Sequence, residues 1–315
     1  TAKALAALDC LTGLSRAALK DRYVRPQITN SREGRISIHD GRHPMVEHAL
    51  KREMFVPNDT ELNHTDQEMI IITGPNMAGK STYMRQVAVL TIMAQTGSFI
   101  PAKSASFAPV DRIFTRVGAA DDISTGQSTF MVEMKEVSHI LCNATKNSLI
   151  LLDEIGRGTS TYDGMSIARA VVEYLNSKVH AYTLFATHYH ELSDMAAENE
   201  HIKNYTVTVK ERGKEITFLR RIVPGSADKS YGIHVARLAG LPESLLKRAD
   251  EILEGLEVEG IKEEPAAPVI RRETALNLFS SPIIDELADL DVMSKTPIEA
   301  MEILFRLSKE AKEGR

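Results

Sequence analysis

Residues 69–82 read MIIITGPNMAGKST, a β-branched apolar run that breaks into a glycine-bounded loop and ends in Lys-Ser-Thr before a helical stretch. The order Gly74, four residues, Gly79, Lys80, Ser81 is typical of a phosphate-binding loop, in which backbone N–H groups wrap the phosphates. The lysine then meets the β/γ-phosphate oxygens, the serine hydroxyl reaches Mg²⁺, and the positive end of the next helix faces the phosphates. The stretch predicts a nucleotide site made by Gly74, Pro75, Asn76, Met77, Ala78, Gly79, Lys80, Ser81 and Thr82.

The composition is that of a globular protein. With 43% apolar residues among 315, the chain is long enough for a sizeable core and for two or three structural units. The net charge is −5 and no long basic block occurs, which argues against strong nucleic-acid binding by this chain alone. No apolar run is long enough for a membrane span, and no charged-then-apolar leader predicts secretion.

The two cysteines, Cys10 and Cys142, lie far apart in the sequence and beside apolar residues. This arrangement predicts reduced thiols buried in the core of a cytoplasmic protein rather than a disulfide framework. Histidines such as His64, His139 and His201 have no zinc-ligand spacing with these cysteines, so we expect no zinc site.

Apolar strands alternate with helical stretches in the central part of the chain. Strands are expected over 35–40, 69–74, 148–154 and 182–188, and helices over 80–93 and 164–175. This alternation predicts an α/β fold with a largely parallel sheet, in which ligands bind beyond the carboxyl ends of the strands. Two further runs, 204–209 and 216–222, read as an antiparallel hairpin.

Both ends of the chain carry apolar residues at helical spacing. Residues 1–20 space their leucines at helical intervals, and the chain opens inside this pattern without an initiator Met, so we expect a piece of a longer protein. After Pro242, one apolar stripe either packs on its own domain or makes a dimer contact. It comprises Leu245, Leu246, Ala249, Ile252, Leu253 and Leu256.

The last 60 residues divide into a charged stretch and a capped helix. Residues 257–275 are charged and contain prolines, which predicts a solvated linker. A capping box then begins at Thr296, and the following helix has an apolar face made by Ala300, Ile303, Leu304 and Leu307. Because so short a tail cannot bury a core of its own, we expect it to serve oligomerisation.

Three acid–base side chains stand at the ends of the two strands that follow the phosphate loop. Asp153 and Glu154 end one strand, which predicts that Asp153 holds the metal and Glu154 faces the attacking water. His188 ends the next strand, where its imidazole would donate to the γ-phosphate or the water; His190 is the weaker candidate. The sequence thus predicts Mg-dependent hydrolysis, with Lys80, Glu154 and His188 as catalytic residues.

Four segments together resemble the MutS family of bacterial DNA mismatch repair proteins. They are TGPNMAGKSTYMRQ (73–86), DDISTGQSTFMVEM (121–134), LLDEIGRGTSTYDG (151–164) and TLFATHYHEL (183–192). The resemblance implies an ABC-type P-loop ATPase domain with a mixed, largely parallel sheet, followed by a helical dimerisation element and a small helical oligomerisation element. The implied boundaries are 1–25 for the end of a lever helix, 26–225 for the ATPase domain, 226–257 for a helix-turn-helix dimerisation element, 258–275 for the linker and 276–315 for the oligomerisation element.

The resemblance also implies residue roles. Ser128 and Thr129 match the signature segment that reaches a partner's γ-phosphate in trans, and the loop 156–164 matches one that couples the two sites. Asn76 matches a nucleotide contact. Phe55 matches an aromatic residue that stacks on adenine, a contact of about 0.5–1.5 kcal/mol beyond burial.

The function implied by the resemblance is that of an ATPase motor. In the intact protein, ATP and Mg at sites shared across a homodimer, or a tetramer held by 276–315, would control a clamp on mismatched DNA and recruit a MutL-type partner. The family's Phe-x-Glu mismatch-reading motif is absent, since none of the nine phenylalanines has Glu two residues later, so this chain alone should not recognise mismatches. The alternatives are another ABC-type DNA-maintenance ATPase and a non-hydrolytic oligomerisation module held together by nucleotide.

Overall fold

The computed structural model describes residues 1–30, 34–50, 54–75, 78–117, 128–212, 215–226 and 231–260, with Ile303 and Arg306. The chain divides into the units Thr1–Ile252 and Leu253–Arg315. Helix α8 (Glu243–Gly260) continues into the start of the predicted linker, which begins at residue 258. The rest of that linker and, apart from Ile303 and Arg306, the predicted oligomerisation element lie outside the described residues.

A six-stranded sheet forms the centre of the first unit, in the order β10-β9-β4-β8-β7-β6. All neighbouring pairs are parallel except β10 and β9, which form the predicted hairpin. The strands are β4 (Met69–Thr73), β6 (Ile113–Arg116), β7 (Leu149–Asp153), β8 (Tyr182–Ala186), β9 (Ile202–Arg212) and β10 (Glu215–Pro224). The predicted mixed, largely parallel sheet is therefore confirmed.

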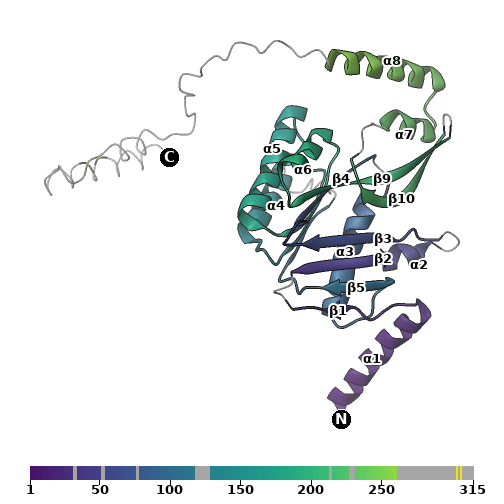
Figure 1. Ribbon diagram of the computed structural model, residues 1–315, viewed down its shortest axis with the longest axis vertical. Helices are drawn as coiled ribbons and strands as arrows, with labels where there is room; N and C mark the ends of the chain where they lie inside the picture. Colours follow the sequence, from purple (N-terminus) through teal and green to yellow (C-terminus); the bar gives the residue numbers. More distant parts are fainter. Residues whose placement is uncertain are drawn as a thin grey trace. The chain divides into compact units, whose positions relative to one another are not determined.

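Helices cover both faces of this sheet because its parallel strands are apolar on both sides. Within β4, Ile70 and Ile72 join one core cluster, and Met69 and Ile71 join the other. The first cluster includes α3 (Lys80–Gln95), and the second includes α4 (Thr129–Asn143) and α5 (Thr161–Tyr174) (Figure 1). The short helices η2 (Leu175–Val179), η3 (His190–Asp194) and α6 (Met195–Glu198) follow α5.

A second, four-stranded sheet has the order β1-β5-β2-β3. Its strands are β1 (Gln27–Ile28), β2 (Arg35–Gly41), β3 (Asn58–Asn63) and β5 (Ser104–Phe107), and α2 (Pro44–Ala49) follows β2. The predicted strand at 35–40 belongs here rather than to the central sheet, because β2 pairs with β3 and β5. Ile36 and Ile38 on β2 pack in the same cluster as α3, which joins the second sheet to the central one.

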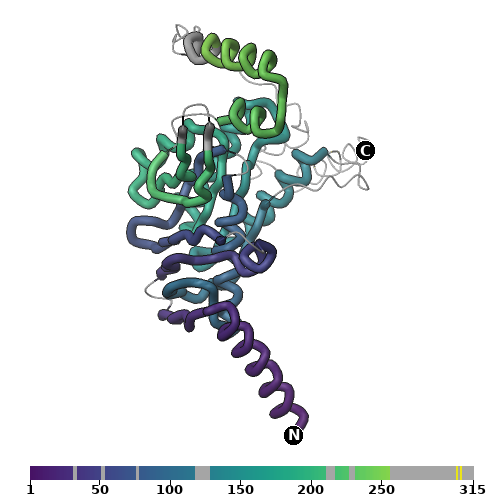
Figure 2. Tube along the Cα trace, turned by 90° about the vertical axis from the view of Figure 1, so that its right-hand side faces the viewer, coloured from purple at the N-terminus to yellow at the C-terminus, as the bar shows by residue number. Residues whose placement is uncertain are grey.

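The helix α1 (Ala2–Lys20), at the purple end of the trace in Figure 2, confirms the predicted N-terminal helix but buries none of its residues. The prediction that both cysteines are core residues is wrong. Cys10 lies on this unburied helix, and Cys142 is exposed on the last turn of α4. Of the helices described, none is long and apolar enough to cross a membrane.

The stripe after Pro242 is split in the structure. The helix α7 (Gly232–Leu238) precedes α8, on which Leu246 is buried while Leu245 and Ile252 are exposed. Leu246 therefore packs within its own domain, which is the first of the two predicted alternatives. Leu245 and Ile252 are exposed and remain available for a contact with another surface.

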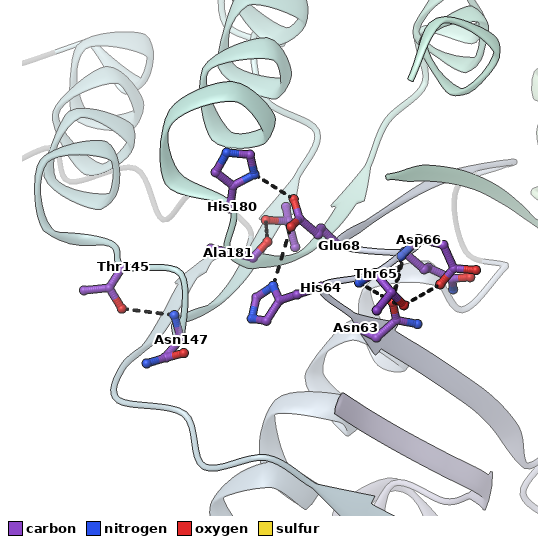
Figure 3. Close-up of polar contacts among 11 residues, drawn as sticks. Asn63, His64, Thr65, Asp66, Glu68, Thr145, Asn147, His180 and Ala181 are labelled. Carbon is purple, nitrogen blue, oxygen red and sulfur yellow. Dashed lines mark hydrogen bonds and ion pairs between the residues drawn. The ribbon is translucent and has the colours of Figure 1, made fainter. Parts of the chain in front are cut away.

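Polar side chains at the amino ends of the central strands bond to one another (Figure 3). Glu68, just before β4, is 5% exposed. Its carboxylate lies 3.0 Å from His180 Nδ1 and 3.6 Å from His64 Nδ1, and the His64 ring stacks on Tyr182. We call Glu68, His64 and His180 the amino-end cluster. It joins the strands β4 and β8 at the edge of the sheet opposite the phosphate loop.

Candidate functional site

The predicted phosphate loop and acidic strand end meet at the carboxyl edge of the central sheet. The loop follows β4, and the acidic residues end β7, which is separated from β4 by β8 alone. Between them lies an open cavity of about 290 Å³. It is lined by Pro75, Gly79, Lys80, Ser81, Thr82, Asp153, Glu154 and Arg157.

Lys80, the first residue of α3, is 4% exposed. Its ammonium donates to the carbonyl oxygens of Gly74 and Pro75, at 3.1 Å from the latter. Burial lowers the pKa of Lys80 against the opposing attraction of Glu154 and Asp153. The loop therefore folds around a buried cation that donates to two backbone carbonyls, which phosphate oxygens could replace.

The loop needs glycine at Gly79, the N-cap of α3, because its φ of 103° lies in the left-handed region. Ala78 is fully buried and packs in the same core cluster as α3. Asn76 and Met77 lie outside the described residues.

Ser81 and Asp153 form an oxygen pair inside the cavity. The Ser81 hydroxyl donates to Asp153 Oδ2 at 2.5 Å. Burial raises the pKa of Asp153, and the Ser81 hydrogen bond opposes that shift. A carboxylate and a hydroxyl suit Mg²⁺, which takes one or two protein oxygens and completes its shell with water and phosphate. The residues present therefore fit the predicted metal.

Glu154 occupies a strained position directly after β7. Its φ of 55° is in the left-handed region, and its N–H donates to Ala186 O at 2.9 Å. Its carboxylate forms an ion pair with Arg157. Strained backbone of this kind clusters at functional sites. The sequence analysis did not select Arg157. Its position, three residues after Glu154, was the signal that could have identified it.

His188 lies two residues beyond the end of β8 and is exposed, without lining the cavity. Its ring centroid is 4.1 Å from that of Tyr189. Although the side chain is exposed, partial desolvation lowers the pKa of His188 against the pull of Glu154, which favours the neutral ring. His190, also exposed, begins η3.

Phe55 lines a second cavity, of about 250 Å³, next to the first. Gly79 and Thr82 line both cavities, so the second cavity directly adjoins the one at the phosphate loop. Arg220 of β10 also lines it and was missed by sequence reasoning. Its φ of 56° falls within the β-bulge between Phe218 and Ile222, and the paired arginines that interrupt this strand were the available signal.

Ser128 and Thr129 stand apart from both cavity linings, at the beginning of α4. Ser128 is the N-cap, and its hydroxyl accepts a hydrogen bond from Met131 N at 3.2 Å. Both residues are exposed. The hydroxyl-bearing start of this helix therefore faces outward, where a second molecule can reach it.

Comparison with known proteins agrees with this architecture. A family model described as MutS domain V matches residues 70–257. The chain is 52% identical over 323 residues to the DNA mismatch repair protein MutS of Acetivibrio thermocellus, covering 99% of this chain and 37% of that protein. It is 54% identical to the proteins of the same name from Syntrophomonas wolfei and Caldicellulosiruptor bescii, covering 98% of this chain in both cases and 35% and 37% of those proteins.

The chain thus spans little more than a third of the length of these relatives. The family match covers more than half of the chain, including the phosphate loop, the acidic strand end and the segment from α4 to most of α8. The predicted ABC-type α/β fold is confirmed. The chain belongs to the MutS domain V family.

Proposed function

We propose that this chain binds ATP with Mg²⁺ and hydrolyses it to ADP and phosphate, as the ATPase and dimerisation part of a DNA mismatch repair protein. The observation that carries this proposal is the meeting of Lys80, Ser81, Asp153 and Glu154 in one cavity, from stretches more than 70 residues apart. A strand–loop–helix with a buried lysine and a neighbouring carboxylate pair is the arrangement that phosphoryl transfer requires.

Phosphate binding would use groups that are already in place. The Lys80 ammonium would exchange its bonds to Gly74 O and Pro75 O for bonds to phosphate oxygens. The N-terminus of α3 would face the same oxygens, since helix N-termini favour anions. Mg²⁺ bound by Ser81 and Asp153 would neutralise negative charge on the phosphates.

Glu154 would act as the general base for the attacking water. Its carboxylate lines the cavity, and the ion pair with Arg157 holds it there. His188 would act as a neutral hydrogen-bond partner of the γ-phosphate or the water, once a bound nucleotide brings it to the cavity.

The nucleobase would occupy the second cavity. Phe55 offers an aromatic face there, and the Arg220 side chain lies on the same lining. Base–aromatic stacking tolerates a cation on the other face of the base, because arginine also stacks on flat π systems. This placement extends the nucleotide from the phosphate loop to Phe55 through Gly79 and Thr82.

The site would be completed by a second copy of the chain. Ser128 and Thr129 are exposed at a helix N-terminus, the kind of group that stabilises a γ-phosphate, yet they do not line their own cavity. A homodimer that places one chain's Ser128 against the other's phosphate loop would explain why Ser128 is exposed and why it does not line its own cavity. Residues 276–315 would extend the dimer to a tetramer.

In the intact cytoplasmic protein, ATP would convert a state bound to mismatched DNA into a clamp that recruits a MutL-type partner. The segments 1–25, 26–225 and 226–257 would be the end of a lever helix, the ATPase domain and the dimerisation element. This chain by itself would neither bind a membrane nor recognise a mismatch.

The test is Mg-dependent ATP hydrolysis per protomer as the protein concentration rises. A site completed by Ser128 of a second copy gives a rate that climbs and then saturates, and that disappears in Glu154→Gln. A rate independent of concentration in a monomeric sample refutes the shared site. Nucleotide binding without turnover at any concentration supports the non-hydrolytic module instead.

A further inference from the structure

Asn58, the first residue of β3, bonds to two segments that line the second cavity. Its Nδ2 atom donates to Arg220 O at 3.1 Å and to Val56 O at 3.3 Å. Its Oδ1 atom accepts a hydrogen bond from Ile222 N at 2.7 Å. Val56 directly follows Phe55 in the sequence. We call the segment with Phe55 and Val56, and the β10 bulge with Arg220, the two walls of the second cavity. One buried carboxamide therefore links both walls.

The bulge that carries Arg220 depends on contacts from outside β10. The pairing of β10 with β9 shifts register between Phe218 and Ile222, and Arg220 has a φ of 56° within this stretch. A residue other than glycine keeps such a conformation only where the surrounding contacts compensate its cost. Asn58 supplies two of these contacts, to Arg220 O and to Ile222 N. Loss of both bonds would therefore allow the bulge to relax and Arg220 to turn.

The bulge places Arg220 beside the phosphate loop. A Cβ atom on Gly79 would lie 3.8 Å from Arg220 Cβ, which is an ordinary van der Waals contact. The Arg220 side chain is exposed and lines the second cavity. Its guanidinium is therefore available to stack on a flat π system bound there.

The start of β3 is itself held to the helix that follows the phosphate loop. The Tyr83 hydroxyl of α3 donates to Asp59 O at 3.1 Å and accepts a hydrogen bond from Thr60 Oγ1 at 3.0 Å. Tyr83 and Thr60 are both buried. Because Asp59 and Thr60 directly follow Asn58, these bonds fix the place of Asn58 relative to α3 and the phosphate loop.

We propose that Asn58 is a positioning residue for the nucleobase, which sets the spacing between Phe55 and Arg220 so that a flat base fits between them. This inference rests on the proposed function, in which the second cavity takes the base of ATP. Because the Nδ2 and Oδ1 atoms of Asn58 are already bonded to backbone groups, Asn58 acts through the two walls and not on the base. A change at Asn58 should therefore weaken the binding of the base and spare that of the phosphates.

The test compares the affinity of the full chain for Mg-ADP with that for Mg-pyrophosphate, which has no base, by calorimetric titration. The Kd for pyrophosphate divided by the Kd for ADP gives the base ratio. Asn58→Ala should lower the base ratio by about 2- to 30-fold, the range expected for losing a stacked arginine, and leave the Kd for pyrophosphate unchanged. Asn58→Asp keeps the size and the acceptor of Asn58 but loses the donor to Arg220 O, so it should lower the ratio as well.

Two further variants separate positioning from a general loss of stability. Asn204 on β9 donates to Ser193 O at 2.7 Å and lines neither of the two cavities, so Asn204→Ala is the matched control. It should destabilise the fold without changing the base ratio. If Asn58 acts through Arg220, adding Asn58→Ala to Arg220→Ala should lower the ratio by much less than it does in the unaltered chain.

Three results would overturn the inference: an unchanged base ratio in both Asn58 variants, an equal fall in Asn204→Ala, or a full further fall in the presence of Arg220→Ala. The proposed function would stand in each case, provided that Mg-ADP binds the unaltered chain and not Lys80→Ala. If neither Mg-ADP nor Mg-pyrophosphate binds the unaltered chain, nucleotide binding is refuted and this inference with it.

Discussion

The two edges of the central sheet use the same strands in opposite ways. At the amino ends of β4 and β8, the Glu68 carboxylate contacts both His64 and His180. At the carboxyl edge, Lys80 bonds to backbone carbonyls and Asp153 to a hydroxyl, and burial disfavours the charged form of both. The amino edge pairs a buried carboxylate with two histidines, whereas the carboxyl edge places its lysine and its two carboxylates around an open cavity that a ligand could fill.

The difference separates stability from function. The carboxyl edge carries desolvated charges and the left-handed Glu154, features that cost stability and that natural proteins keep where a site requires them. The amino-end cluster links the start of β4 to the start of β8 through the Glu68–His180 contact and lines neither of the two cavities described above. Variants at the two edges should therefore affect different measurements.

The largest effect is expected from Glu154→Gln at the carboxyl edge. Loss of a positioned general base lowers kcat by about 10²- to 10⁴-fold. Nucleotide affinity and the free energy of unfolding should stay close to those of the unaltered chain, because Gln keeps the size of Glu and the lost ion pair, with the largely exposed Arg157, contributes little. Steady-state hydrolysis and a nucleotide titration measure the two parts. A variant that hydrolyses ATP at the original rate would remove Glu154 from the mechanism.

At the amino edge, Glu68→Gln should lower the free energy of unfolding and leave nucleotide affinity unchanged. The buried carboxylate would be replaced by a neutral group facing two histidines, which costs about 1–3 kcal/mol of unfolding free energy. Urea denaturation measures the loss, and Glu173→Gln in an exposed pair on α5 is the control, expected within about 0.5 kcal/mol of the unaltered chain. A fall in nucleotide affinity without a fall in stability would show that the two edges are not separate.

A smaller effect is expected from Phe55→Ala. Losing the aromatic face should weaken ATP binding by about 0.5–1.5 kcal/mol, or about 2- to 13-fold in Kd, with kcat kept once the site is saturated. Phe99→Ala, a partly exposed phenylalanine that does not line this cavity, is the matched control. Equal affinities for the two variants would place the base elsewhere.

The smallest effect concerns pH and compares one histidine from each edge. Burial lowers the pKa of His64 beside Glu68, Lys146 and His180, and partial desolvation lowers that of His188 beside Glu154, Arg157, Lys80 and His190. The unfolded chain then binds protons more readily near pH 6.5, so both histidines contribute stability that is full above that pH and declines as the pH falls below it.

Replacing either histidine with Gln should therefore flatten the decline in unfolding free energy between pH 7 and about pH 5. Urea denaturation at a series of pH values checks this for each variant. A steeper decline in His64→Gln or His188→Gln would mean that the folded chain prefers the charged ring.

Sequence reasoning reached the parts of the molecule that depend on neighbouring residues. The phosphate loop and the strand ending at Asp153 follow from local spacing and periodicity, and so does the hairpin. For Arg220 the paired arginines gave a local sign of an interrupted strand, but its place in the lining of the second cavity depends on the bulge and on the packing of two sheets. The amino-end cluster was out of reach, since Glu68 and His180 are 112 residues apart. The burial of the cysteines was mispredicted because apolar neighbours do not reveal whether a helix has a partner.

The most direct test of the account is the shift in melting temperature that Mg-ATP produces in the unaltered chain and in Lys80→Ala. A ligand that binds only the folded state at 100 times its Kd adds about 2.7 kcal/mol of stability. The account predicts a clear upward shift in the unaltered chain and little or none in Lys80→Ala. No shift in the unaltered chain, or an equal shift in both, would contradict a nucleotide site at the carboxyl edge of the sheet.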